Sequence, residues 1–259
     1  MFSLTDAPQI DGKVAVVTGA NSGLGKATSQ ALAQKGAHVI MLARNSQKGE
    51  QAKTEILKAH PHASLEVIQM DLASLASVKA AADLIMQKNS TLDLLINNAG
   101  LMATPQGKTE DGFETQFGVN HLGHWALTGQ LLPLLNHGQP ARIVTVTSSA
   151  HHMTTRINFN DPFLEKRYSA WRAYAQSKLA NYYFALGLHK KFQSANLPIF
   201  SLLAHPGLSR TNLQIETVKQ GGGGLLGKWS EDLVLKFGMP ADVGAMPQIR
   251  AALDPNAKS

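Results

Sequence analysis

Short apolar segments alternate with longer segments of helical periodicity along most of the chain. The apolar segments are rich in β-branched residues and carry few polar interruptions, which is typical of strands buried on both faces of a parallel sheet. We expect strands at Val14–Thr18, His38–Leu42, Leu65–Met70, Leu92–Asn97, Arg142–Ser148 and Ile199–Ala204.

The intervening segments have the apolar spacing of helices, and several begin with a capping residue such as Ser74 or the Asn45-Ser46 pair. We expect helices at Leu24–Lys35, Gln47–Ala59, Leu75–Lys88, Phe113–Leu135 and Ala170–Ser194. Regular alternation of strand and helix predicts the α/β class. The chain is therefore expected to form a single Rossmann-type, doubly wound parallel sheet with helices on both faces, over residues 1–259.

Composition excludes several kinds of protein. Hydrophobic residues make up 44% of the 259 residues, which supplies a buried core and excludes a mainly disordered chain. The sequence has no cysteine, so disulfides, thiolate zinc sites and a cysteine nucleophile are impossible. No signal peptide and no apolar stretch of membrane-spanning length is present, so we expect no transmembrane segment and a cytoplasmic location.

The net charge of +6 is scattered along the chain and is not gathered into a basic block. This pattern argues against a nucleic-acid partner and fits a solvated surface with one site for an anionic cofactor. His121 and His124 are three residues apart, but no third metal ligand is evident, so packing or hydrogen bonding is the preferred interpretation. No metal site is predicted.

A glycine-rich segment, Thr18-Gly19-Ala20-Asn21-Ser22-Gly23-Leu24-Gly25, joins the first expected strand to the first expected helix. Glycines at such a junction allow a tight turn and let the backbone approach a pyrophosphate at the helix N-terminus. The residues expected to contact a dinucleotide here are Gly19, Asn21, Ser22, Gly23, Leu24 and Gly25.

The end of the second strand favours one nicotinamide cofactor over the other. NAD-binding folds usually carry an acidic residue there for the ribose 2′-hydroxyl. This chain has Arg44 followed by Asn45 and lacks the acid. Because a guanidinium pairs with a phosphate that a carboxylate would repel, the predicted cofactor is NADP(H). The alternative is an ordinary surface arginine.

The segment at about 206–240 differs in character from the rest. Four glycines at 221–224 precede the apolar residues of Leu225–Phe237. We expect a lid over an apolar substrate pocket, and the alternatives are a flexible tether or a membrane-surface contact.

These motifs resemble those of the short-chain dehydrogenase/reductase family, over residues 12 to 212. Besides the glycine segment, the resemblance rests on Asp71-Leu72, Asn97-Asn98-Ala99-Gly100, Asn120, Ser149, Tyr174, Lys178 and Pro206-Gly207-x-x-x-Thr211. It implies a catalytic tetrad of Asn120, Ser149, Tyr174 and Lys178. It also implies cofactor contacts from Asp71, Leu72, Asn98, Ala99, Gly100, Tyr174, Lys178, Pro206, Gly207 and Thr211. Ser148 adjoins Ser149, which is preferred because it aligns better with the family serine.

Several segments, including Asn120-His121-Leu122-Gly123-His124 and His205-Pro206-Gly207, resemble the retinol dehydrogenase-like branch of the family. They are also similar to protochlorophyllide reductases and WW-domain oxidoreductases. This resemblance implies an apolar carbonyl or alcohol as substrate. Family members are commonly dimers or tetramers, which leaves a homodimer open. They also continue beyond the segment matching 251–255, so we expect either a truncated chain or a short tail.

Tyr174 and Lys178 are four residues apart in an expected helix, so both project from one face. A nearby ammonium, helped by the positive nicotinamide in the oxidised complex, favours the phenolate. Tyr174 can then give a proton to a substrate oxygen or remove it in the reverse direction. The leading hypothesis is an NADP(H)-dependent oxidoreductase acting on a carbonyl or alcohol. Reduction of a C=C bond is disfavoured because the chain lacks a cysteine. An NADP(H)-binding sensor or scaffold without turnover is the alternative from another class.

Overall fold

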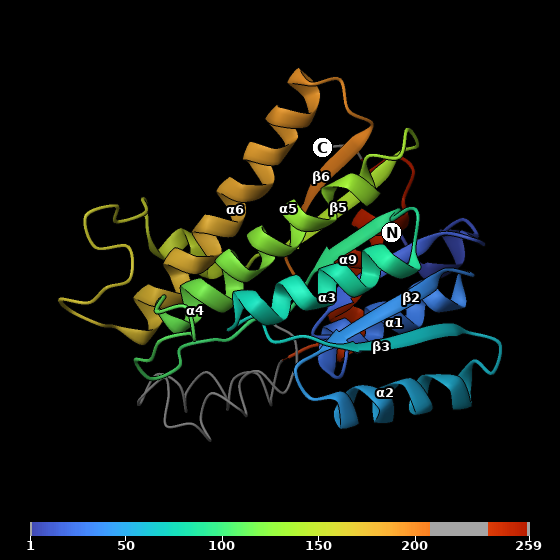
Figure 1. Ribbon diagram of the computed structural model, residues 1–259, viewed down its shortest axis with the longest axis horizontal. Coiled ribbons are helices and arrows are strands. Elements are labelled where there is room, and N and C mark those ends of the chain that lie inside the picture. The colour runs from blue at the N-terminus through green and yellow to red at the C-terminus, as the bar shows by residue number, and fades with distance from the viewer. Residues whose placement is uncertain (1, 208–237, 258–259) are drawn as a thin grey trace.

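Six parallel strands form one sheet in the computed structural model, which describes residues 2–207 and 238–257 (Figure 1). The strands are β1 (Val14–Thr18), β2 (His38–Ala43), β3 (Ser64–Gln69), β4 (Leu94–Asn97), β5 (Ala141–Val146) and β6 (Ile199–Ala204). Their order across the sheet is β3-β2-β1-β4-β5-β6. The predicted α/β class and doubly wound parallel sheet are confirmed, and each strand lies at its expected segment.

Helices connect the strands and cover both faces of the sheet (Figure 1). They are α1 (Gly23–Gln34), α2 (Ser46–Ala59), α3 (Leu75–Lys88), α4 (Thr115–Phe117), α5 (Gly123–Leu135), α6 (Ala170–Ser194) and α9 (Ala241–Leu253), with short η1 (Leu4–Asp6), η2 (Gly118–Leu122) and η3 (Ser149–Met153). Two predicted helix starts are confirmed by their caps. The Asn45 side chain accepts the amide of Lys48 at 2.9 Å, and Ser74 accepts that of Ser77 at 3.4 Å.

The helix expected at Phe113–Leu135 differs from the prediction in its middle. The structure has α4, then the π-helical segment η2, then α5 in direct succession. In a π-helix each backbone bond spans five residues, and here the amide of Gly123 donates to the carbonyl of Gly118. The wider turn carries Asn120, one of the predicted site residues.

The strand order reverses between β1 and β4. The chain begins at β1, adds β2 and β3 on one side, and then crosses back to add β4, β5 and β6 on the other. In open parallel sheets of this kind, ligands bind in the crevice beyond the carboxyl ends of the strands, where the order reverses. The predicted site residues follow the strands at this edge.

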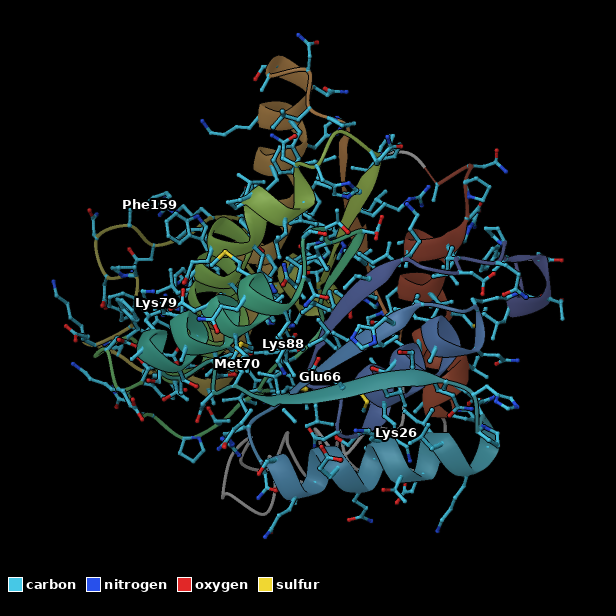
Figure 2. The ribbon with its side chains drawn as sticks, turned by 45° about the vertical axis from the view of Figure 1, so that its right-hand side comes forward. Lys26, Glu66, Met70, Lys79, Lys88 and Phe159 are labelled. Atoms are coloured by element: carbon cyan, nitrogen blue, oxygen red, sulfur yellow. The ribbon has the colours of Figure 1, made fainter. Side chains whose placement is uncertain are left out.

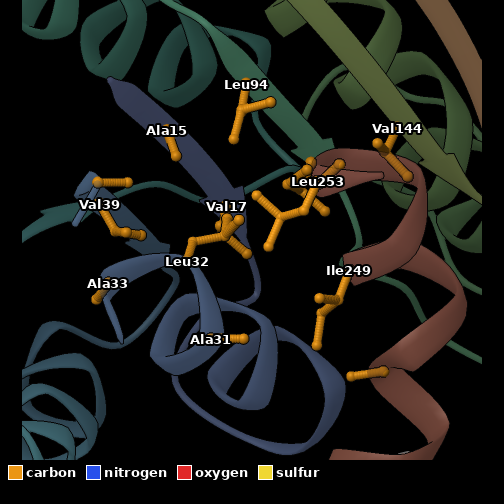
Figure 3. Packing of buried hydrophobic residues seen from close by; sticks show 14 of the residues in the cluster. Ala15, Val17, Ala31, Leu32, Ala33, Val39, Leu94, Val144, Ile249 and Leu253 are labelled. Atoms are coloured by element: carbon orange, nitrogen blue, oxygen red, sulfur yellow. The ribbon is translucent and has the colours of Figure 1, made fainter. Parts of the chain in front are cut away.

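Two hydrophobic cores hold the helices to the sheet. On one face, α1 and α9 pack on the central strands, and Figure 3 shows Leu32, Ile249 and Leu253 around Val17. On the other face, α3, α5 and α6 bury residues such as Leu127 and Leu131. Each large apolar side chain removed from water contributes roughly 1.5–3 kcal/mol, so these cores fix the strands that carry the site.

The edge strand β3 carries charge. Glu66 of β3 lies beside Lys88 of α3, and the two form an ion pair (Figure 2). An exposed strand edge with free backbone groups invites pairing with other chains, and a charged pair on it disfavours that.

The predicted lid at about 206–240 falls largely outside the described part of the chain, because residues 208–237 are not described. Thr211 lies there too. Among the described residues, no helix is long and apolar enough to cross a membrane.

Candidate active site

A cradle for a phosphate lies where β1 meets α1. Gly19 has a φ of +65°, a conformation that side chains disfavour. A Cβ added at Gly25 would overlap the carbonyl oxygen of Gly19 and lie 2.6 Å from the Asn98 side-chain nitrogen. One added at Gly19 would lie 3.0 Å from the Cβ of Ala99. Only glycine therefore fits at these two positions, and the turn packs closely against the loop after β4 at the N-terminus of α1, where a pyrophosphate can bind.

The glycine segment is joined to the loop after β4 through Thr18. Its hydroxyl oxygen accepts the amides of Asn98 at 3.0 Å and Ala99 at 2.9 Å. The Asn98 side chain donates in return to the carbonyl of Thr18 at 2.8 Å. Two of the predicted cofactor segments are thus held together across the point where the strand order reverses.

The end of β2 is followed by a positive charge. Arg44 directly follows the buried Ala43 and is exposed. Asn45, also predicted to contact the cofactor, caps α2 with its side chain. A ribose phosphate bound beside the glycine segment would lie within the field of the Arg44 guanidinium, so the residues present fit NADP(H).

Asp71 and Leu72 follow β3 as predicted. One carboxylate oxygen of Asp71 accepts the backbone amide of Ala73 at 2.9 Å. The backbone amide of Asp71 donates to the Ser77 hydroxyl at 2.9 Å. Leu72 is buried and touches the position of Gly123, where an added Cβ would lie 2.7 Å from the Leu72 carbonyl oxygen. This turn therefore packs against the start of α5, directly after the segment η2 that carries Asn120.

Tyr174 and Lys178 lie one turn apart on the buried face of α6. Tyr174 and Lys178 are each 5% exposed, and the ammonium lies 5.8 Å from the centre of the tyrosine ring. The Lys178 Nζ donates to the carbonyl of Val146 at the end of β5, at 3.3 Å. The Asn181 side chain donates to the same carbonyl at 3.2 Å. The strand end thereby fixes where the ammonium lies.

Asn120 joins this group through its side-chain amide. The amide oxygen accepts the backbone N–H of Leu101 at 2.7 Å, and the amide nitrogen donates to the Leu101 carbonyl at 2.9 Å. The same nitrogen donates to the Ser177 hydroxyl at 2.9 Å, which donates to the carbonyl of Tyr174 at 2.8 Å. A Cβ added at Gly100 would lie 3.2 Å from Asn120 Oδ1 and 3.4 Å from Lys178 Nζ.

The serine that reaches the tyrosine is Ser148. It shares a side-chain hydrogen bond with Tyr174 and is partly buried. Ser149, the residue preferred from the sequence, is exposed and begins η3. Ser148 is therefore the serine beside Tyr174, and the choice of Ser149 as the catalytic serine stays a prediction.

Burial sets the protonation of the two central groups. Burial raises the pKa of Tyr174 above its ordinary value, and the hydrogen bond with Ser148 lowers it in part. Burial lowers the pKa of Lys178 to about 8. At neutral pH the phenol therefore keeps its proton while the lysine is mainly an ammonium.

The segment after β6 supplies the remaining described residues. Pro206 is partly buried and Gly207 exposed, with a φ of +64° at Gly207. The Gly207 amide donates to Nδ1 of His205 at 2.7 Å. In the glycine segment, Asn21, Ser22, Gly23 and Leu24 are all partly exposed at the cradle.

Comparison with known proteins identifies the family. A family model described as short chain dehydrogenase matches residues 13–221. The chain belongs to this family. It is 45% identical over 205 residues to retinol dehydrogenase 12 of Homo sapiens, covering 79% of this chain and 64% of that protein. It is 44% identical over 209 residues to retinol dehydrogenase 11 of Mus musculus, covering 81% and 65%.

These likenesses place the short-chain dehydrogenase in the retinol dehydrogenase-like branch, as expected from the sequence. The chain spans about 64% of the length of these relatives. Among solved structures, an uncharacterized protein from Mycobacterium paratuberculosis matches with a TM-score of 0.78 and 42% identity, covering 97% of this chain and 80% of that one. A short-chain dehydrogenase/reductase from Burkholderia phymatum, in complex with NAD, matches at 0.75 with 22% identity, covering 97% and 87%, and shares the fold.

Two residues of this short-chain dehydrogenase outside the predicted set also support the site. The side chain of Gln248, in α9, donates to Asn98 at 3.1 Å and to Thr28 at 2.5 Å. His124 contacts both Thr18 and Asn120. No local sequence signal marks Gln248, which lies 150 residues from Asn98. His124 was correctly expected to act in packing or hydrogen bonding.

Acid is expected to destabilise this short-chain dehydrogenase through its buried histidines. Burial lowers the pKa of both His121 and His124 from 6.5 to about 4. As the pH falls below 6.5, these histidines bind protons in the unfolded chain before they do in the folded one. The free energy of unfolding therefore falls between pH 6.5 and pH 4. From pH 7 to pH 5 the free energy of unfolding should fall by about 2 kcal/mol for each histidine.

Urea denaturation at the two pH values measures this loss. His121→Gln removes one of the two groups and should reduce the pH dependence by about half. An identical pH dependence in the variant and the parent would show that His121 is not the titrating group.

Proposed function

We propose that the protein is an NADP(H)-dependent oxidoreductase that interconverts a carbonyl and an alcohol on an apolar substrate. One observation carries the proposal. The buried Tyr174 shares a hydrogen bond with Ser148 and lies one helical turn from Lys178, in a chain whose turn between β1 and α1 admits only glycine at Gly19 and Gly25.

The family and the named relatives support an oxidoreductase. The most similar curated proteins reported above are retinol dehydrogenases. Structural neighbours are recorded with NAD, as in Burkholderia phymatum, and with NADP, as in Shigella flexneri. Because both cofactors occur among proteins of this fold, the choice of NADP(H) rests on Arg44 of this chain.

When bound, the nicotinamide would supply or accept the hydride. Ser148 holds the substrate oxygen by a hydrogen bond and stabilises the charge that develops on it. Tyr174 passes its phenolic proton to that oxygen during reduction, and the raised pKa keeps this proton in place at neutral pH. Lys178, an ammonium below about pH 8, stabilises the tyrosine after it has lost the proton.

The surroundings of Tyr174 support an apolar substrate. Met102, Ala103 and Ala150 form a buried cluster with the tyrosine, and Trp171 packs against this cluster. The indole ring of Trp171 meets the tyrosine ring edge-on with centroids 6.2 Å apart. A substrate that reaches the phenol therefore meets mainly carbon.

The alternative of a sensor or scaffold predicts cofactor binding without turnover. A protein that only binds a nucleotide has no use for a serine and a tyrosine joined by a hydrogen bond above the lysine. The two functions are separated by following NADPH absorbance with a panel of aldehydes and ketones from small to retinal-like. Turnover supports the oxidoreductase, whereas binding without turnover across the whole panel supports the sensor.

Arg44→Asp should reverse the cofactor preference. The carboxylate repels a 2′-phosphate and can bond a 2′-hydroxyl, so the Kd for NADPH should rise roughly 10- to 100-fold while that for NADH falls. Fluorescence titration with each nucleotide measures the change.

Lys190→Asp makes the same change of charge at an exposed position near the far end of α6 and serves as the control. An equal rise in the Kd for NADPH in both variants would show that Arg44 acts only through the net charge of the protein.

A further inference from the structure

A buried hydrogen-bonded path runs from the phosphate cradle to the catalytic tyrosine through His124. The His124 ring is held by two atoms, the Asn120 carbonyl oxygen 2.9 Å from Nδ1 and the Thr18 hydroxyl 2.8 Å from Nε2. Their exposed fractions are 1% for His124, 0% for Asn120 and 0% for Thr18. All three residues are therefore shielded from bulk solvent.

The partners determine where the protons lie. A carbonyl oxygen can only accept, so Nδ1 of His124 carries the proton and donates to Asn120. In the neutral ring Nε2 is then an acceptor, and the Thr18 hydroxyl donates to it. Burial lowers the pKa of His124 to about 4, so the ring is neutral at neutral pH.

Because the Thr18 hydroxyl donates its hydrogen to His124, its oxygen can accept the backbone amides of Asn98 and Ala99. Both amides donate to that oxygen, at 3.0 and 2.9 Å. The Ile96 carbonyl is the other group near the hydroxyl, at 3.4 Å, and the Nε2 contact is shorter. His124 therefore fixes the rotation of the hydroxyl that joins the two cofactor loops.

At the other end, Asn120 is held by its backbone and its side chain together. Asn120 lies in the π-helical η2, and Nδ1 of the His124 ring contacts its backbone carbonyl oxygen at 2.9 Å. The Asn120 side chain then reaches Ser177, whose hydroxyl donates to the Tyr174 carbonyl.

We propose that His124 is a positioning residue that holds the phosphate cradle and the catalytic asparagine in one fixed relation. This inference rests on the proposed function. Nδ1 of His124 contacts Asn120 and Nε2 contacts Thr18, so each contact can be removed by a different substitution.

Two variants separate the contacts. The side-chain nitrogen of asparagine lies near the place of Nδ1, so His124→Asn keeps the donor to Asn120 and removes the acceptor for Thr18. The side-chain oxygen of glutamine reaches near the place of Nε2, so His124→Gln keeps the acceptor for Thr18 and removes the donor to Asn120. His137→Asn and His137→Gln make the same changes at a partly buried histidine after α5.

We expect His124→Asn to weaken cofactor binding and His124→Gln to slow turnover. An unpaired buried group is costly, so His124→Asn should raise the Kd for NADPH roughly tenfold with kcat near that of the parent. His124→Gln should lower kcat roughly tenfold with the Kd near that of the parent. The His137 variants should change neither. Equal changes in Kd and kcat from both His124 variants would overturn the proposal, because they would indicate general loss of packing.

Backbone amide exchange tests the same assignment without turnover. The amides of Asn98 and Ala99 depend on Thr18, and that of Leu101 depends on Asn120. Exchange should speed up at residues 98 and 99 in His124→Asn and at residue 101 in His124→Gln. If the parent turns over no substrate, the proposed function fails while this readout still decides the role of His124. Unchanged exchange at all three amides would overturn it.

Discussion

Tyr174→Phe is expected to lower kcat by roughly 10²–10⁴-fold, the range that general acid–base catalysis contributes. The change removes one oxygen from a residue that is 5% exposed and leaves the ring that packs on Trp171. The phenol is the proton donor to the substrate oxygen in the proposed reaction, and its raised pKa keeps that proton available. Turnover in the absorbance assay measures the loss.

The affinity for NADPH should change far less than kcat in this variant, because the variant keeps the tyrosine ring and leaves the glycine segment unchanged. Fluorescence titration with NADPH is therefore the control. Parental turnover in Tyr174→Phe would exclude the tyrosine as the proton donor. Loss of turnover together with loss of NADPH binding would indicate a damaged fold.

Ser148→Ala is expected to lower kcat/KM by roughly 10²–10³-fold, the cost of removing one hydrogen-bond donor from a developing oxyanion. Ser149→Ala is the matched control, because the same atom is removed from the next residue, which is exposed. It should retain nearly the parental value. Steady-state kinetics on one carbonyl substrate compares the two variants.

A fall in kcat/KM in Ser149→Ala alone would show that Ser149, the serine predicted from the sequence, contacts the substrate oxygen. Equal losses would show that the substrate oxygen contacts both hydroxyls.

Much of the fold could be predicted because its signals are local. The strand at Val14–Thr18 is a short apolar segment bounded by polar residues, and its predicted ends agree with β1. The glycine segment after it lies at the cradle because both belong to one turn. Asn45 and Ser74 predict helix starts because each cap bonds an amide only three residues away.

Other features depend on contacts that no local pattern encodes. Which of two adjacent serines meets Tyr174 depends on where β5 ends, since a shift of one residue moves a side chain to the other face of a strand. The π-helical turn at Asn120 carries no clear signal within an otherwise helical segment. Gln248 reaches Asn98 only because α9 packs on α1, and that contact joins parts of the chain 150 residues apart.

The most direct test of the central claim uses NADPH that carries deuterium at both C4 positions and follows the label into the product alcohol by mass spectrometry. The account predicts an alcohol one mass unit heavier, labelled on the former carbonyl carbon, and formed roughly 10²–10⁴-fold more slowly by Tyr174→Phe. An unlabelled product, or NADPH binding with no product from any carbonyl of the panel, would contradict it.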